Sequence, residues 1–199
     1  MFLFYRNALA KNLCSSYKKE WNKRIEDNKL LYEFSLNTGA IPYIATATYR
    51  GWGLTKDLIH KEFGEYINGK YIIKNSNGVE GATATSYYDY HFNNEIIENS
   101  LIATYWCNGN VKIKDYGCSR FHISNDSNLH FNNGKNVILW LNVYDNSVVN
   151  IGDIKIGDSI YVVKYSDSCV INYKDMGGKI IIRNRDVDID AFYEIINND

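Results

Sequence analysis

The sequence has little proline, no excess of charge of either sign and no long apolar run. A single proline, Pro42, occurs in 199 residues, and 22 Lys and Arg against 23 Asp and Glu give a formal net charge of −1. A chain with this balance has no overall field that attracts nucleic acid or an anionic membrane. The apolar opening Met-Phe-Leu-Phe-Tyr meets Arg6 at once, too early for a membrane span or a secretory signal. We expect no nucleic-acid or membrane partner, and a location in the cytoplasm or in a particle assembled there.

The motifs of common enzyme and cofactor classes are missing too. The patterns G-x-S-x-G, G-x-x-x-x-G-K-[ST] and G-x-G-x-x-G do not occur. The four cysteines show no C-x-x-C spacing and have no adjacent His pair that would complete a zinc site. We predict no catalytic residues, no cofactor, no metal, and thiols that stay free in a reducing compartment.

What the sequence does contain is a repeat between Asn108 and Arg183. A turn residue precedes a short, mainly apolar segment again and again, as in Ser119 before Arg-Phe-His-Ile and Ser159 before Ile-Tyr-Val-Val. The turn residues of the repeat are Gly109, Ser119, Ser127, Lys135, Ser147, Ser159, Ser168 and Gly178. They lie about 8 to 12 residues apart, so two of them make a coil of about 20 residues, the size at which parallel strands stack into a solenoid.

Strands are also expected before the repeat. Residues 70–74 alternate, a turn follows at 75–78, and a Thr- and Tyr-rich run covers 82–92, which together indicate a hairpin-like pair. Further strand is expected from Glu95 to Trp106. We see no linker in this region, so the repeat should be packed directly against what precedes it.

The two ends of the chain have a helical rather than an alternating period. Apolar residues recur every four positions from Leu9 to Ile25, shorter helical patterns follow up to Gly69, and Asp190 can cap a last helix. We predict an α+β fold with a helical domain (1–69), a right-handed parallel β-helix, or β-solenoid, of about four coils (70–189) and a C-terminal capping helix (190–199). The helices would cover the exposed ends of the solenoid.

The carboxylates of the repeat could suggest glycan cleavage, because many parallel β-helices cut polysaccharides with clustered acids. The candidates are Asp145, Asp153, Asp158, Asp167 and Asp175. All of them lie beside turns, where Asp bonds the local backbone, so we predict a turn role. The alternating Asp186, Asp188 and Asp190 lack the pattern of a calcium loop and are interpreted as edge protection.

Two histidines, His122 and His130, occupy equivalent positions of successive repeat segments. Each lies between two apolar residues that should face inward, so both should face outward. A metal site would need a third ligand, which the sequence does not single out. Solvated surface histidines are the favoured interpretation.

Aromatic residues are the positive signal for binding. The candidate binding surface consists of rings in segments expected to be strands: Tyr87, Tyr88, Tyr90, Tyr105 and Trp106. Outward Tyr and Trp can stack on sugar rings or anchor protein interfaces. The alternative, that these rings are divided between the core and scattered surface positions, stays open.

Several segments resemble known proteins. The pair Glu20-Trp21, the phrase Gly51-Trp-Gly-Leu-Thr55 and the run from Phe63 to Tyr71, followed by turn-strand repeats, are similar to small uncharacterised β-helix proteins encoded by tailed phages and prophages of gut Bacteroidetes. The resemblance implies a phage-linked role, as a virion component or as a factor that acts on the host. It implies no catalytic residue.

We therefore interpret the chain as a non-enzymatic binding or assembly protein that contacts another protein, either a further copy of itself or a virion component. One alternative is a module that binds or cleaves glycans. Another is an inhibitor that occludes the surface of a host protein.

Overall fold

The computed structural model describes residues 83–185 without a gap, residues 69–74, and ten residues nearer the N-terminus: 19, 22, 23, 26, 27, 55–57, 60 and 61. The chain divides into two compact units, residues 1–66 with 186–199 and residues 67–185. The fold described below is that of the second unit. No helix in the described part of the chain is long and apolar enough to cross a membrane.

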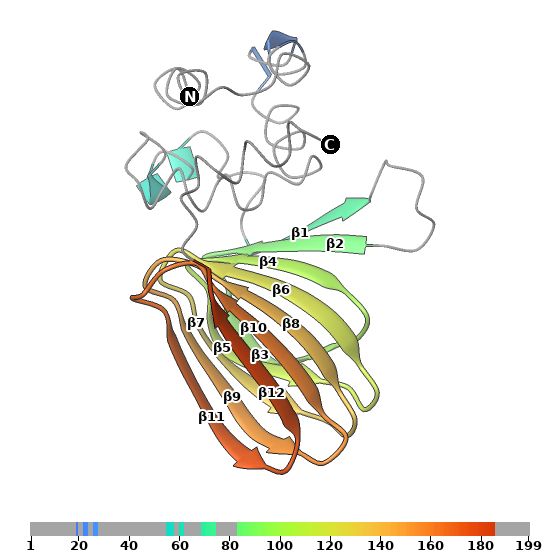
Figure 1. Cartoon of the computed structure of the whole chain (residues 1–199). Coiled ribbons are helices and arrows are strands. Elements are labelled where there is room, and N and C mark those ends of the chain that lie inside the picture. The colour runs from blue at the N-terminus through green and yellow to red at the C-terminus, as the bar shows by residue number, and fades with distance from the viewer. Residues whose placement is uncertain are drawn as a thin grey trace. The chain divides into compact units, whose positions relative to one another are not determined.

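Residues 69–74 and 83–184 form two sheets, in which strands that are distant in the sequence lie side by side (Figure 1). We call the seven-stranded one sheet A; it contains, in spatial order, β1 (Gly69–Lys74), β2 (Thr83–Tyr88), β4 (Leu101–Tyr105), β6 (Cys118–Ser124), β8 (Ile138–Val143), β10 (Ser159–Lys164) and β12 (Lys179–Asn184). The five-stranded one is sheet B, with β11 (Val170–Met176), β9 (Val148–Lys155), β7 (Asn128–Asn133), β5 (Asn108–Ile113) and β3 (His91–Ile97).

The chain alternates between the two sheets and stacks each coil on the one before. All neighbours are parallel except β1 and β2, which form an antiparallel pair. The coil length of about 20 residues is confirmed: the backbone N–H of Cys107 donates to Oγ of Ser127, 20 positions further on. The β-solenoid and the hairpin-like start are therefore confirmed, with about five coils rather than four.

The interior of the solenoid is filled by side chains from alternate positions of both sheets. In sheet A, Phe121 lies opposite Leu141, and Leu141 lies opposite Val162, all buried. In sheet B, Leu129 and Phe131 of β7 are the buried residues that face the interior. The rings of Phe121 and Phe131 meet edge to face, with 4.9 Å between centroids. Burying each such side chain stabilises the fold by about 1.5–3 kcal/mol, which favours one register because a one-residue slip would turn the apolar set outward.

The corners from β2 to β3, from β4 to β5, from β6 to β7 and from β8 to β9 have a left-handed backbone. Their successive residues are Asp89, Trp106, Asn125 and Asp145, with φ of 46°, 54°, 57° and 48°. The N–H of Asp89 bonds the carbonyl of Tyr105 and that of Trp106 bonds the carbonyl of Asn125, so the corners continue the stacking. Asn and Asp adopt this conformation readily, which explains why these corners need little glycine.

The predicted α+β fold class is wrong. Every element within the described residues is a strand, and the described part contains neither an N-terminal helical domain nor a C-terminal capping helix. Nearly all of the segment predicted as a helical domain (1–69), and all of the segment predicted as a capping helix (190–199), lie outside the described residues.

Gly109 should be the glycine of the solenoid that tolerates substitution least. Its φ is +103°, and a Cβ added there would lie 2.2 Å from the carbonyl oxygen of Phe92 in the preceding coil. We predict that Gly109→Ala lowers the free energy of unfolding by more than about 2 kcal/mol, because strain and steric overlap add. Urea unfolding followed by circular dichroism measures this.

Gly152→Ala is the matched control. Gly152 has no left-handed φ, and its added Cβ would contact only the carbonyl oxygen of Phe131, at 3.1 Å. We expect a smaller loss than for Gly109→Ala. Equal losses at the two positions would contradict the stacking of β5 on β3 that Gly109 permits.

Candidate functional site

The five aromatic residues predicted to form a binding surface are mostly inaccessible. Tyr87, Tyr88 and Tyr105 are buried, and Tyr90 and Trp106 are partly buried. Tyr87 belongs to the solenoid core, whereas Tyr88 and Tyr105 stack on each other with 4.5 Å between centroids. Outward alternation predicted accessible rings, but Tyr87, Tyr88 and Tyr105 cannot contact a ligand in the structure as it stands.

Trp106 is the unusual member of this set. Its corner position has φ of 54°, where the neighbouring coils carry Asp or Asn. A bulky residue costs about 1–2 kcal/mol in this conformation. The sequence therefore keeps tryptophan at a corner that favours a smaller residue, and Trp106 remains a candidate for a role of its side chain.

A different group of rings lies on the outer face of sheet A. In register on neighbouring strands are Arg120 of β6, Trp140 of β8 and Tyr161 of β10. The rings of Trp140 and Tyr161 are nearly parallel, 14° apart, with 5.8 Å between centroids. The guanidinium of Arg120 covers Trp140 at 5.8 Å, and the ammonium of Lys179 covers Tyr161 at 5.4 Å. We call these four residues the aromatic row.

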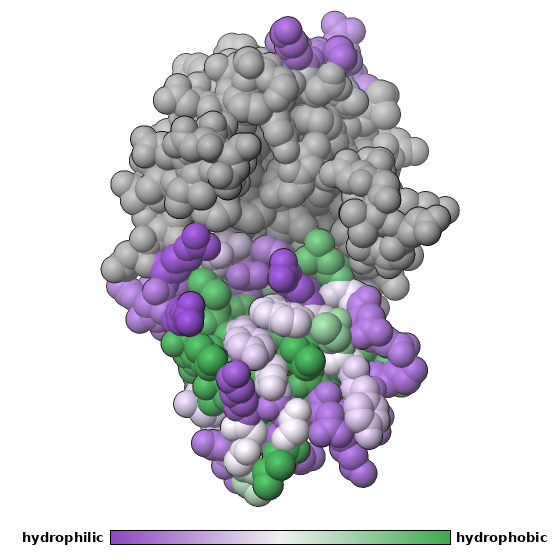
Figure 2. Space-filling view, turned by 45° about the vertical axis from the view of Figure 1, so that its right-hand side comes forward, coloured by the Kyte–Doolittle hydropathy of each residue, from purple (hydrophilic) through white to green (hydrophobic). Residues whose placement is uncertain are grey.

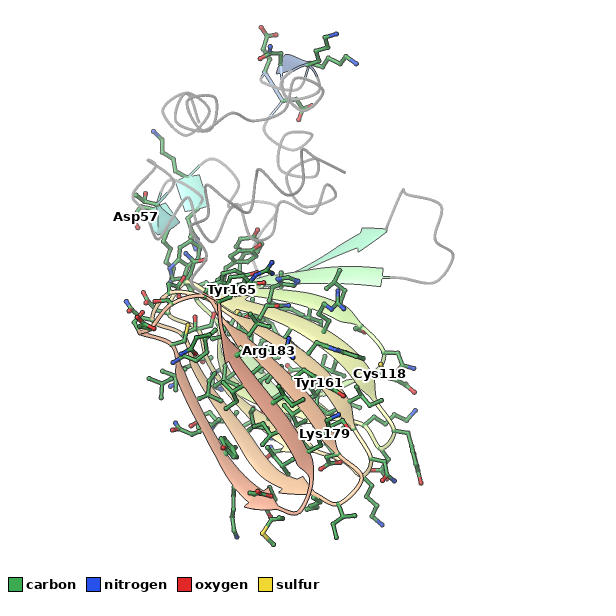
Figure 3. The ribbon with its side chains drawn as sticks, viewed as in Figure 1. Asp57, Cys118, Tyr161, Tyr165, Lys179 and Arg183 are labelled. Atoms are coloured by element: carbon green, nitrogen blue, oxygen red, sulfur yellow. The ribbon has the colours of Figure 1, made fainter. Side chains whose placement is uncertain are left out.

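The aromatic row is a stack closed by a cation at each end. Parallel in-register pairing places like positions one strand spacing apart, about 4.8 Å, so that flat side chains stack face to face. Both ring faces are then occupied, by another ring or by a cation, and the ring edges point away from the sheet. Figure 3 shows Tyr161 and Lys179 on the sheet that faces the viewer, together with Arg183.

This face carries positive charge without acidic neighbours. None of the seven strands of sheet A contains Asp or Glu. Arg120, Lys179 and Arg183 form no ion pair within residues 87–185; the two that the structure describes there join Lys114 to Glu98 and Lys174 to Asp153. Each of these three cations is thus available to a partner.

Beside the aromatic row runs a polar and aromatic line that ends in Tyr165. Nδ1 of His122 lies 3.1 Å from the hydroxyl of Tyr144, and the ring of Tyr144 stacks on that of Tyr165 at 4.5 Å. Burial, and then the charge of Arg120, lower the pKa of His122 to about 4. His122 is neutral at pH 7, so the charge of this face comes from Arg and Lys alone. The interpretation of His122 as a solvated histidine is wrong.

Comparison with known protein families, curated proteins and solved structures found no match. The chemistry of this chain's own side chains therefore carries the argument about function. Figure 2 shows the solenoid from a second direction, with apolar residues mixed among polar ones rather than collected into one large patch.

The outer face of sheet B has a different character, because it is lined by amides. Nδ2 of Asn172 donates to Oδ1 of Asn150 at 2.9 Å, and Nδ2 of Asn150 lies 3.4 Å from Nε2 of His130. His130 is exposed here, as predicted, but it lies on the sheet opposite His122. The two histidines cannot share a metal ion, and residues 87–185 contain no cluster of three possible metal ligands.

Three of the five aspartates weighed for catalysis hold backbone in place, as predicted. Asp158 accepts from the N–H groups of Val137 and Lys155, at 3.0 and 2.9 Å, and Asp175 accepts from Gly177 at 2.8 Å. Asp153 instead lies within β9 and pairs with Lys174. No bond of the Asp167 side chain to the backbone is described.

Asp145 is the third of these turn aspartates, and it joins two coils at a buried corner. Its carboxylate accepts from the N–H groups of Asn125 at 2.5 Å and Asp126 at 3.3 Å, and from Oγ of Ser147 at 3.0 Å. Burial nevertheless raises the pKa of Asp145 to about 6. A structural aspartate therefore titrates close to neutral pH.

The aromatic row was missed in the sequence because its four members belong to four successive coils. Trp140 and Tyr161 are 21 positions apart, and only the register of β8 with β10 brings them together. A signal was present in the spacing: Arg120, Trp140 and Tyr161 lie 20 and 21 positions apart, which is the coil length of the repeat. Comparing residues one coil length apart would have paired them.

The raised pKa of Asp145 predicts a pH-dependent stability. The pKa of Asp145 is about 6 in the folded state, above the 3.8 of an unperturbed Asp, so the folded state binds the proton more tightly than the unfolded chain does. Protonation of Asp145 therefore stabilises the fold at low pH, and this stabilisation is lost as pH rises from about 4 to 6. We predict that Asp145→Asn lacks this loss, which is at most about 3 kcal/mol. The measurement is the free energy of unfolding in urea, wild type against Asp145→Asn, from pH 4 to pH 7.

The Asp158→Asn variant controls for the loss of a turn carboxylate as such. Like Asp145, Asp158 is buried and bonds backbone N–H groups. If the difference between wild type and Asp145→Asn is the same at every pH, the carboxylate of Asp145 is not titrating in this range.

Proposed function

We propose that this chain is a non-enzymatic binding protein whose outer face of sheet A contacts an acidic surface of another protein. The observation that carries the proposal is the combination of the aromatic row with three cations that have no acidic neighbour within sheet A. Trp, Tyr and Arg are the residues that most often dominate binding energy at protein interfaces. Acidic groups of a partner would form ion pairs with these cations, which have no acidic neighbour in sheet A.

The geometry of the row favours a protein over a glycan. A sugar ring stacks on an exposed aromatic face, but the facing surfaces of Trp140 and Tyr161 are turned toward each other and their outer surfaces toward Arg120 and Lys179. Only ring edges and charged groups remain for contact. Glycan cleavage has no support from Asp145 and Asp158 either, because their carboxylates bond backbone N–H groups.

The number of charges favours a protein over a nucleic acid. Strong binding of a phosphate backbone requires many Lys and Arg contacts, whereas this face offers Arg120, Lys179 and Arg183 and the whole chain has a net charge of −1. Taken together with the resemblance to phage-encoded proteins, the proposal makes a virion component or a host protein the partner. Occlusion of a host protein is one outcome of such contact.

The test is site-specific photo-crosslinking with the full chain. A photo-reactive amino acid replaces Tyr161 on sheet A or, as the matched control, Lys112 on the exposed outer face of sheet B. We expect a discrete protein adduct from position 161 and none of that mass from position 112. The purified partner should lose at least about tenfold in affinity with Arg120→Glu or Trp140→Ala, as expected for residues at the centre of an interface.

The Lys112→Glu variant controls for a change of net charge and should bind like the wild type. Circular dichroism checks that every variant keeps its strands. Identical adducts from positions 161 and 112 would contradict the proposal, as would an adduct that disappears after nuclease treatment.

A further inference from the structure

Within the described residues, the last coil of the solenoid has exposed apolar residues at positions that are buried in the coil before it. Ile182 is 38% exposed and Tyr173 is 45% exposed, whereas the residues opposite them in the preceding coil, Val162 and Ile151, are 1% exposed. Ile180 is likewise more exposed than its neighbour Ile160. The last coil thus has the inward apolar residues of a buried coil, but no further coil among residues 83–185 lies on them.

Among the described strands, β12 also has a neighbour on one side only. Within sheet A the strand pairs with β10 alone. The N–H groups of Lys179 and Arg185 donate to Asp158 and Lys164, toward β10. Because both backbone groups of a residue in a parallel strand point the same way and alternate along it, those of Ile180, Ile182 and Asn184 point to the free edge.

Charge selects what can pair with this edge. The outward side chains of β12 include Lys179 and Arg183, and neither has an ion pair within residues 87–185. In an added strand, a residue directly opposite shares the same face of the sheet. Acidic residues would therefore lie beside Lys179 and Arg183, and apolar residues of the opposite parity would cover Ile180 and Ile182.

We propose that β12 binds an extended segment of the partner protein in which acidic and apolar residues alternate, adding it to sheet A as a further strand. This inference rests on the proposed function and specifies its partner. Main-chain hydrogen bonds to the free edge supply affinity, and the alternating side chains supply specificity. The added strand would lie beside β12, and Tyr161 is on β10, the strand on the other side of β12. Residues of the partner that flank the added strand can therefore reach the aromatic row.

A second copy of the chain fits this edge less well. Two β12 strands related by a two-fold axis run antiparallel, and the register that sets Ile180 against Ile182 also sets Lys179 against Arg183. Like charges directly opposite each other destabilise a pair of strands. An acidic partner meets the same apolar residues without this repulsion.

The experiment measures binding of the full chain to synthetic peptides with blocked ends. The probe alternates Asp with Val or Ile over seven residues, and a second peptide has Lys in place of Asp. We expect the acidic peptide to bind, the basic peptide not to bind, and Lys179→Glu/Arg183→Glu to weaken the acidic peptide at least tenfold. The same double variant should gain binding of the basic peptide, which loss of fold would not produce.

Peptide backbone methylation separates strand addition from plain attraction of charge. Two versions of the acidic peptide carry N-methyl groups on alternate residues, one set facing β12 in the added strand and the other facing solvent. We expect one version to lose binding and the other to keep it. Lys112→Glu, which changes a cation of sheet B, should leave binding unchanged.

Equal binding of both methylated peptides would overturn the proposal, because charge alone would then suffice. A stable dimer in sedimentation that binds no peptide would overturn it in favour of a second copy at this edge. Neither result touches the proposed function, which fails only if the crosslinking at position 161 and the Arg120→Glu variant show no specific protein partner.

Discussion

Parallel, in-register stacking of coils is the constraint on which the rest of this structure depends. A single coil of about 20 residues cannot bury its own inward side chains, so each coil is stable only where another lies against it. Phe121, Leu141 and Val162 are buried because they form one continuous column through β6, β8 and β10. The corners obey the same rule, since Asp145 bonds the backbone of the preceding coil rather than only its own turn.

The same stacking that buries the inner columns builds the outer face. An outward-facing side chain on one strand has, one strand spacing away, the outward-facing side chain of the equivalent position in the next coil. Flat residues then stack, as Trp140 does on Tyr161, and amides form lines, as Asn150 and Asn172 do on sheet B. The two outer faces therefore differ in chemistry although one repeat produces both, because its alternate segments fall on different sheets.

The sequence was sufficient for the solenoid and insufficient for its faces. Strand and turn follow from local residues such as Ser119, Ser147 and Ser159, and these were predicted correctly together with the coil length. The predicted α+β class was wrong because the elements that the structure describes are all strands, whereas the segments with a helical period lie almost wholly outside the described residues. Tyr87, Tyr88 and Tyr105 were expected to be accessible but are buried, Tyr87 as part of the solenoid core and the other two stacked on each other. The aromatic row depends on the register between coils, which no local pattern contains.

Net charge was a poor guide to binding because the charges of this chain are segregated. Among residues 83–185 the acids lie in turns or in sheet B, whereas the charged residues in the strands of sheet A are all basic. At physiological salt, charges are screened over about 8 Å, less than the roughly 10 Å that separate two sheets packed face to face. A partner that touches the outer face of sheet A therefore experiences Arg120, Lys179 and Arg183 and very little of the acids elsewhere. A balanced chain excludes long-range attraction of polyanions, but it does not exclude contact with an acidic surface at one face.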